Sequence, residues 1–210
     1  MMKQIAEILL NIKAVSLSPS EPFTWASGIK SPIYCDNRLI LSYPAERRLV
    51  EEALAQTIRE SFPETEMIMG TATAGIPHAA IAAWMLDLPM GFVRGKAKDH
   101  GKQNAIEGQI RPGQKVVVVE DLISTGGSSL DVVETLRQAG CEVIGLVSVF
   151  TYGMTKARVR FEEAAVPVVS LANYDELLEV AAASRYITEG EIQKLKTFMA
   201  DPQSPAWMEL

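Results

Sequence analysis

The chain has 210 residues, of which 48% are hydrophobic, 22% are charged and 7% are aromatic. A chain of this length and composition can bury the core of one sizeable domain, and it differs from disordered, collagen-like and membrane proteins. The formal net charge of -6 argues against a surface that is basic overall, so we expect no nucleic-acid partner.

The first 42 residues predict a small N-terminal cap. Ile5, Ile8 and Leu9 recur at helical spacing, which predicts an amphipathic helix over residues 1–15 and not a secretory signal peptide. No apolar run approaches the roughly 20 residues that a membrane-spanning helix needs, so we expect a cytoplasmic protein with no membrane partner. Two segments, residues 23–28 and 31–34, follow as short strands around turns.

Strands and helices alternate from Tyr43 onwards. A helical pattern runs from Tyr43 to Phe62, where Pro63 ends it. Further strands are expected over residues 67–69, 90–94, 115–120 and 142–150, and further helices over residues 76–86, 128–139 and 189–199. The alternation predicts an α/β fold, a mostly parallel central sheet flanked by helices. We assign the core to residues 43–187, and a C-terminal helix and tail to residues 188–210.

Residues 116–129 carry the clearest chemical signal. Four consecutive valines predict a buried strand, and Glu120 and Asp121 lie at its carboxyl end, where ligands bind in open α/β sheets. Residues 124–128 supply two glycines, three hydroxyls and consecutive backbone N–H groups at a helix start, which predicts a phosphate site. Acids beside an anion site suit a phosphorylated sugar, because carboxylates accept hydrogen bonds from ribose hydroxyls, directly or beside a magnesium ion.

This run resembles the binding motif for 5-phosphoribosyl-1-pyrophosphate (PRPP) in the type I phosphoribosyltransferases. The resemblance implies the fold of that family, PRPP as a substrate, and Mg²⁺ as a cofactor held mainly by PRPP with Asp121 beside it. The residues that the resemblance places at PRPP are Glu120, Asp121, Leu122, Ile123, Ser124, Thr125, Gly126, Gly127 and Ser128.

Residues 92–102 follow a predicted strand and gather positive charge on a glycine-bounded loop. This loop resembles the catalytic loop of the orotate phosphoribosyltransferases, and the resemblance places Arg94, Lys98 and His100 at the departing pyrophosphate. In that family the loop reaches into the neighbouring subunit's active site. The resemblance therefore implies a homodimer whose subunits share this loop.

Residues 23–34 are similar to the N-terminal signature of the same family, an aromatic-Thr strand, then Ser-Gly, then Ser-Pro-aromatic. The resemblance implies that the cap contributes to binding the base, and it places Ser124 and Tyr34 at orotate. Many members carry a lysine where this chain has Ala26 and another where it has Ala74, so these two contacts to PRPP are not carried over. His78 is expected to be a partly buried helix residue.

The implied activity is the transfer of the 5-phosphoribosyl group from PRPP to orotate, giving orotidine 5'-phosphate and pyrophosphate in pyrimidine nucleotide biosynthesis. Two alternatives stay open. A purine phosphoribosyltransferase would share residues 120–128 but would use a different base pocket and loop. An RNA-binding regulator of a pyrimidine operon would share the fold but would need a basic face, which the net charge does not support.

Overall fold

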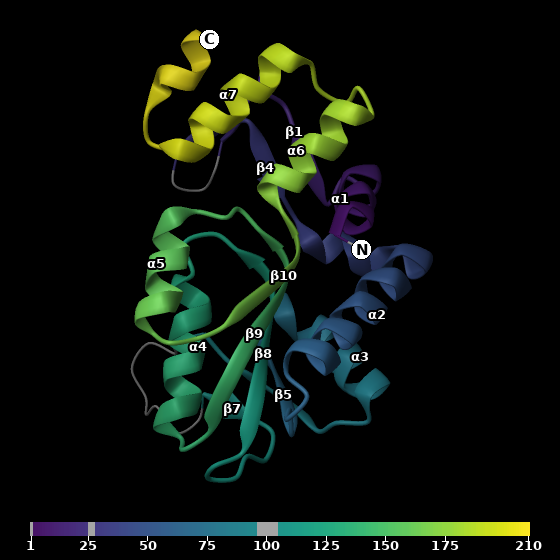
Figure 1. The fold of residues 1–210 in the computed structure, drawn as a ribbon, viewed down its shortest axis with the longest axis vertical. Helices are drawn as coiled ribbons and strands as arrows, with labels where there is room; N and C mark the ends of the chain where they lie inside the picture. Colours follow the sequence, from purple (N-terminus) through teal and green to yellow (C-terminus); the bar gives the residue numbers. More distant parts are fainter. Residues whose placement is uncertain (1, 25–27, 96–104) are drawn as a thin grey trace.

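A computed structural model describes residues 2–24, 28–95 and 105–210, and its centre is a six-stranded sheet with the order β10-β9-β8-β5-β6-β7 (Figure 1). The strands are β5 (Met67–Thr71), β6 (Met90–Val93), β7 (Ile106–Glu107), β8 (Lys115–Ile123), β9 (Glu142–Thr151) and β10 (Val168–Asn173). All neighbouring strands are parallel except β7, which pairs antiparallel with β6. The predicted mostly parallel sheet is therefore confirmed.

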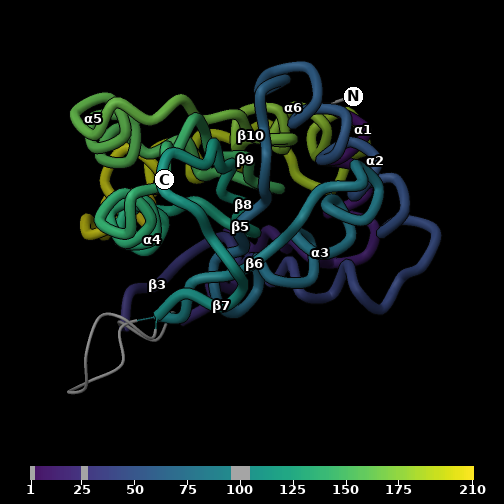
Figure 2. The backbone as a smooth tube through the Cα atoms, turned by 90° about the horizontal axis from the view of Figure 1, so that it is seen from below, coloured from purple at the N-terminus to yellow at the C-terminus, as the bar shows by residue number. Residues whose placement is uncertain are grey.

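Helices cover both faces of this sheet. Figure 2 shows α2 (Pro44–Ser61) and α3 (Gly75–Leu86) on one side, and α4 (Gly127–Gln138) and α5 (Thr155–Glu163) on the other. The valines of β8 alternate between two separate clusters of buried side chains. Val117 and Val119 belong to the cluster that includes residues of α2 and α3, whereas Val116 and Val118 belong to the cluster that includes residues of α4 and α5. Burial on both faces explains why this strand is continuously apolar.

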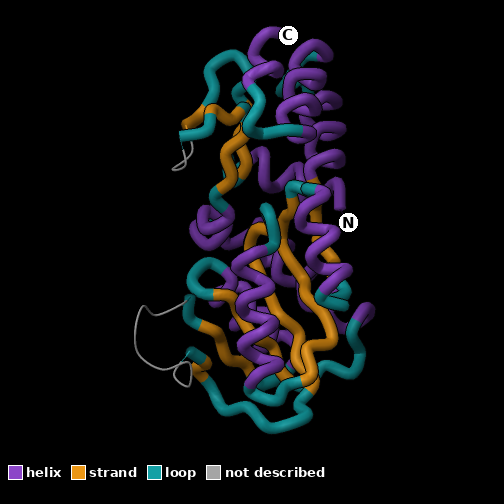
Figure 3. Tube along the Cα trace, turned by 90° about the vertical axis from the view of Figure 1, so that its left-hand side faces the viewer, coloured by secondary structure: helices purple, strands orange, loops and turns teal. Residues whose placement is uncertain are grey.

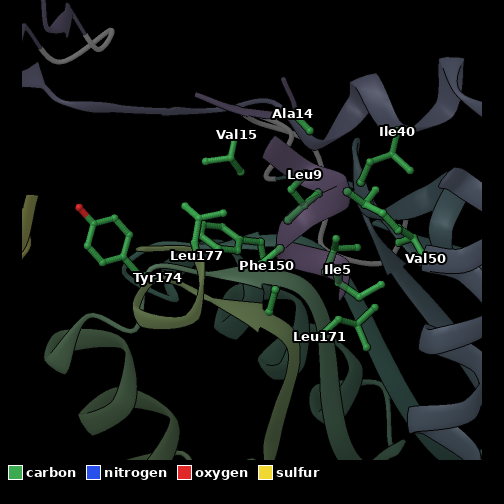
Figure 4. Close-up of a cluster of buried hydrophobic side chains, with 14 of the residues drawn as sticks. Ile5, Leu9, Ala14, Val15, Ile40, Val50, Phe150, Leu171, Tyr174 and Leu177 are labelled. Atoms are coloured by element: carbon green, nitrogen blue, oxygen red, sulfur yellow. The ribbon is translucent and has the colours of Figure 1, made fainter. Parts of the chain in front are cut away.

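The N-terminal and C-terminal parts meet beyond one end of the sheet, where β10 leads directly into α6 (Tyr174–Ala183) (Figure 1). Helix α1 (Met2–Asn11) packs against α6 and β10. Figure 4 shows Ile5 and Leu9 of this helix among Phe150, Leu171 and Leu177. One apolar cluster thus joins α1, β9, β10 and α6.

Short elements complete this end of the molecule. The antiparallel pairs β1 (Val15–Leu17) with β4 (Ile33–Cys35) and β2 (Phe23–Thr24) with β3 (Lys30–Ser31) lie beyond the central sheet, beside the C-terminal helices (Figure 3). The remaining elements are the 3₁₀ helix η1 (Asn37–Ser42), α7 (Glu189–Ala200) and the 3₁₀ helix η3 (Pro205–Glu209). The buried Trp207 of η3 packs edge-on against Phe198 of α7, with 5.6 Å between the ring centroids.

The structure adds elements that the sequence pattern did not predict, among them β1, β7, α5, β10 and α6. It also extends β8 past the predicted end at Glu120, because Leu122 and Ile123 pair with Phe150 and Thr151 of β9. Four of the residues expected at PRPP, Glu120, Asp121, Leu122 and Ile123, are therefore part of the central sheet. Within residues 2–24, 28–95 and 105–210, no helix is both long enough and apolar enough to cross a membrane.

Candidate active site

Parallel strands bring chemically distinct residues to one edge of the sheet. Thr71 ends β5, Arg94 follows β6, Glu120 lies near the end of β8, and Thr151 ends β9. Since β5 lies between β6 and β8, the segment that follows β5 is next to both of the predicted functional segments. This carboxyl edge is the position at which open α/β sheets bind ligands.

The turn between β8 and α4, residues 124–128, is called the phosphate loop below. Gly126 adopts a φ of 75°, a left-handed conformation that glycine tolerates without a steric penalty. The backbone N–H groups of Thr125, Gly126 and Gly127 have no acceptor in the part of the chain that the structure describes. Free N–H groups at the positive end of a helix dipole form a site for a phosphate.

Helix α5 packs against this loop from outside. A Cβ atom on Gly126 would lie 2.9 Å from the ring of Phe161, and one on Gly127 would lie 3.5 Å from Nη1 of Arg160. The same Nη1 atom donates a hydrogen bond to the backbone oxygen of Thr125 at 3.1 Å. The loop therefore combines a conformation that favours glycine with a neighbour that leaves little room at Gly126.

Glu120 is buried, with 5% of its surface exposed, and both of its carboxylate oxygens are used by protein donors. Oε1 accepts from the Thr71 hydroxyl at 2.5 Å and from the Asp121 N–H at 3.1 Å, and Oε2 accepts from the Ser129 hydroxyl at 2.9 Å. Burial raises the pKa of the Glu120 carboxyl to about 7. The hydrogen bond from Thr71 lowers this pKa, and the negative charge of Asp121 raises it. Glu120 thus ties β5 and the start of α4 to the end of β8.

Asp121 differs from its neighbour, because its half-buried carboxylate accepts no hydrogen bond from any residue that the structure describes. This free carboxylate suits a magnesium ion, which prefers oxygen ligands and commonly takes only one or two carboxylates besides substrate oxygens and water. No group of three His, Cys, Asp or Glu side chains gathers around a possible metal position in residues 2–24, 28–95 and 105–210. That Mg²⁺ is held mainly by PRPP, with Asp121 beside it, stays a prediction.

The N-terminal segment reaches the same place through Asn37. Its Nδ2 donates to the backbone oxygen of Asp121 at 2.7 Å, and the side chain is only 1% exposed. The Cys35 thiol contacts Oδ1 of Asn37 at 3.4 Å. Tyr34 on the same strand is 44% exposed, and its ring lies 5.6 Å from that of Phe23. Asn37 thus ties the segment that follows β4 to the carboxyl end of β8.

The predicted cationic residues are only partly described. Arg94 follows β6, is 62% exposed at its side chain, and forms an ion pair with Glu107 of β7. Lys98 and His100 lie outside the described residues. The nine residues expected at PRPP run from the end of β8, through the turn, into the first residues of α4. Ser124 in this turn is half-buried.

Several residues at this edge carried no role in the sequence analysis. Ser129 lies within residues 116–129, so its hydroxyl was an available signal, whereas Thr71 follows the predicted strand over residues 67–69. Asn37 and Arg160 had no such signal, because their contacts to residues 121 and 125 span 84 and 35 positions. His78 is fully buried between α2 and α3, where Nδ1 lies 2.6 Å from Glu51, so it is more buried than predicted.

Known proteins resemble the chain over nearly its whole length. Residues 38–195 match the family described as "Phosphoribosyl transferase domain". The orotate phosphoribosyltransferase of Listeria monocytogenes serotype 4b (strain F2365) is 57% identical over 202 residues, which cover 96% of this chain and 97% of the relative. That of Bacillus subtilis (strain 168) is 56% identical over 205 residues, or 98% and 95% of the two chains. The solved orotate phosphoribosyltransferase of Aeropyrum pernix has a TM-score of 0.77 and 29% identity, covering 88% of this chain and 99% of its own.

Proposed function

The chain belongs to the orotate phosphoribosyltransferases, and on that premise we propose that it transfers the 5-phosphoribosyl group from PRPP to orotate, giving orotidine 5'-phosphate and pyrophosphate. Membership confirms the expected family and its type I fold. One observation supports the substrate assignment: the Asp121 carboxylate and the N–H groups of the adjacent phosphate loop have no partner among the described residues. This pairing provides for the ribose hydroxyls and the 5-phosphate of one substrate.

The reaction is a substitution at C1 of the ribose, in which a ring nitrogen of orotate forms the new bond while the bond to pyrophosphate breaks. Asp121 accepts hydrogen bonds from ribose hydroxyls, and the N–H groups of the phosphate loop bind the 5-phosphate. Glu120 holds the loops on either side of the site through Thr71 and Ser129. When Mg²⁺ is bound with PRPP, it neutralises part of the charge of the leaving pyrophosphate.

Positive side chains complete the proposed site at the pyrophosphate. Arg94, Lys98 and His100 carry this role by family resemblance, because the leaving group gains negative charge as the bond breaks. Arg94 already has a carboxylate partner in Glu107. We expect Arg94 to exchange this exposed ion pair, which contributes little to stability, for the more highly charged pyrophosphate.

Orotate is proposed to bind beside Tyr34 and Ser124. The exposed ring of Tyr34 and the half-buried Ser124 support this placement, since a flat ring stacks on an aromatic face and a hydroxyl can bond to a carboxylate or carbonyl. Thr151 does not offer a free hydroxyl, because it donates to the Ile123 oxygen at 3.3 Å. Ala74 lies at the start of α3, and Ala26 lies outside the described residues.

The active form is proposed to be a cytoplasmic homodimer whose subunits share the loop that carries Lys98 and His100. Family resemblance supplies this loop sharing, and an exposed apolar side chain supports association. Trp84 on α3 is 81% exposed, and aromatic side chains are enriched at protein interfaces. No observation favours the purine or RNA-binding alternatives over orotate transfer.

The direct test is to incubate the protein with PRPP and Mg²⁺ and, in separate reactions, orotate, uracil, hypoxanthine, xanthine or adenine. We expect only orotate to be consumed, with one pyrophosphate released for each orotidine 5'-phosphate formed. Omission of PRPP is the control. Consumption of a purine in place of orotate would contradict the proposal.

A further inference from the structure

Helix α5 carries a positive side chain that faces the phosphate loop. Arg160 is half-buried on this helix, and its Nη1 donates to the backbone oxygen of Thr125 at 3.1 Å. Within the described ranges, no carboxylate forms an ion pair with Arg160, whereas Arg158 of the same helix pairs with Glu162 at 2.9 Å. Arg160 thus adds a positive charge next to the loop that no described acidic side chain neutralises.

The contact also determines the direction of a peptide group. In a planar trans peptide the C=O of one residue and the N–H of the next point in opposite directions. A hydrogen bond from Arg160 to the Thr125 oxygen therefore turns the N–H of Gly126 away from α5. This N–H is one of those without an acceptor in the described structure, so the turn leaves it free for a ligand.

The conformation of Gly126 makes such a restraint useful. A glycine has access to both positive and negative φ, so the loop has more alternative conformations to lose than one built from other residues. In particular, rotation of the peptide between residues 125 and 126 would present a carbonyl oxygen to the anion instead of an N–H. An arginine that binds the carbonyl from outside opposes that rotation.

We propose that Arg160 is a positioning residue for PRPP, which orients the N–H of Gly126 toward the 5-phosphate and adds positive charge beside it. This inference rests on the proposed function, because it assigns the phosphate loop to the 5-phosphate of PRPP. Arg160 acts through the loop backbone, so its loss changes the affinity for the phosphorylated substrate more than the chemical step. Orotate, which has no phosphate, is affected little.

The test compares R160Q and R160K with R158Q, a control on the same helix that removes the same charge from an exposed ion pair. We expect R160Q to raise the KM for PRPP about tenfold, the effect of losing one hydrogen bond from a charged donor. The KM for orotate and kcat should stay within about twofold of wild type. R160K should recover part of the loss because it keeps the charge, and R158Q should behave as wild type.

Binding of ribose 5-phosphate, measured by calorimetry, isolates the phosphate subsite from pyrophosphate and from the base. We expect its Kd to rise in R160Q in proportion to the KM for PRPP, while thermal unfolding stays close to that of R158Q. Equal behaviour of R160Q and R158Q in ribose 5-phosphate binding would overturn the inference, as would a loss confined to kcat. A wild-type protein that binds ribose 5-phosphate but transfers nothing to orotate would contradict the proposed function and leave the binding comparison valid.

Discussion

Two adjacent carboxylates at the end of β8 have different environments, and this difference separates their roles. Glu120 is buried and accepts hydrogen bonds from Thr71 and Ser129. Asp121 is half-buried, and none of the described residues donates to its carboxylate. A substitution at Glu120 disturbs the acceptor of buried hydroxyls, whereas a substitution at Asp121 removes a carboxylate to which no described residue donates.

We therefore expect Asp121→Asn to lower kcat/KM by a factor on the order of 10²–10³, by analogy with loss of one electrostatic contact at a reacting group. Its free energy of unfolding should stay within about 0.5 kcal/mol of wild type, as for surface changes that break no contact. Glu120→Gln is the comparison, since an amide N–H₂ facing a hydroxyl donor should cost about 1–3 kcal/mol of stability. Steady-state kinetics and urea unfolding measure both. An Asp121→Asn protein that is fully active would remove Asp121 from the proposed site.

A second prediction concerns the buried pair of Glu51 and His78, away from the site. Burial raises the pKa of the Glu51 carboxyl, while the hydrogen bond with His78 opposes the rise. A raised folded-state pKa means that the folded protein binds a proton more tightly than the unfolded chain, so this contribution to stability is present below pH 4.5 and is lost as pH rises through the raised value.

The free energy of unfolding of wild type relative to E51Q should thus decrease as the pH rises above 4.5. E51Q keeps an oxygen that can accept from His78 but cannot ionise. E52Q is the matched control, because Glu52 is the exposed neighbour on α2 and should show no such trend. Urea unfolding at a series of pH values measures the difference. A constant difference between wild type and E51Q would contradict the assignment.

At the scale of elements, local sequence patterns predicted the central strands and the helices between them. The valine run of β8 is a contiguous signal, and so is the path from Glu120 to Ser128. Helix α5 was missed because only Ala157 and Phe161 among its residues are buried, which is too few for a helical pattern. The contacts from Asn37, Thr71 and Arg160 to the path join residues 84, 49 and 35 positions apart, and no local pattern encodes such distances.

A further prediction concerns the phosphate loop. Its shape depends on the left-handed φ of Gly126 and on the contact between this residue and Phe161 of α5. Gly126 and Gly113 have the same φ of 75°, but a Cβ atom would meet Phe161 only at Gly126 and open space at Gly113. We expect Gly113→Ala to cost about 1 kcal/mol for the left-handed conformation. Gly126→Ala should cost at least about 1 kcal/mol more, because Phe161 must move. Urea unfolding of both variants measures the difference, and equal losses would show that the contact with α5 is unimportant.

The whole molecule is held together around the site by contacts from distant parts of the chain. Asn37 joins the N-terminal segment to β8, and Arg160 joins α5 to the phosphate loop. Helix α1 packs on α6 and β10. The base subsite proposed at Tyr34 and the PRPP subsite proposed at Asp121 are therefore fixed relative to each other within one subunit. The cationic residues Lys98 and His100 are the exception, since family resemblance places them in the site of the other subunit.

The last prediction tests this sharing by complementation between two inactive variants. Lys98→Ala removes a charge from the shared loop, and Asp121→Asn removes a group from the PRPP subsite without the clash that a substitution at Gly126 would add. If the loop acts on the partner, a dimer with one subunit of each kind has both changes in one site and a second site that is intact. Such a dimer, purified with two different affinity tags, should have about half the activity of wild type. If each loop acts on its own subunit, both sites carry one change and the mixed dimer stays inactive. Wild-type subunits with the same two tags, separated and recombined in the same way, show whether exchange preserves activity.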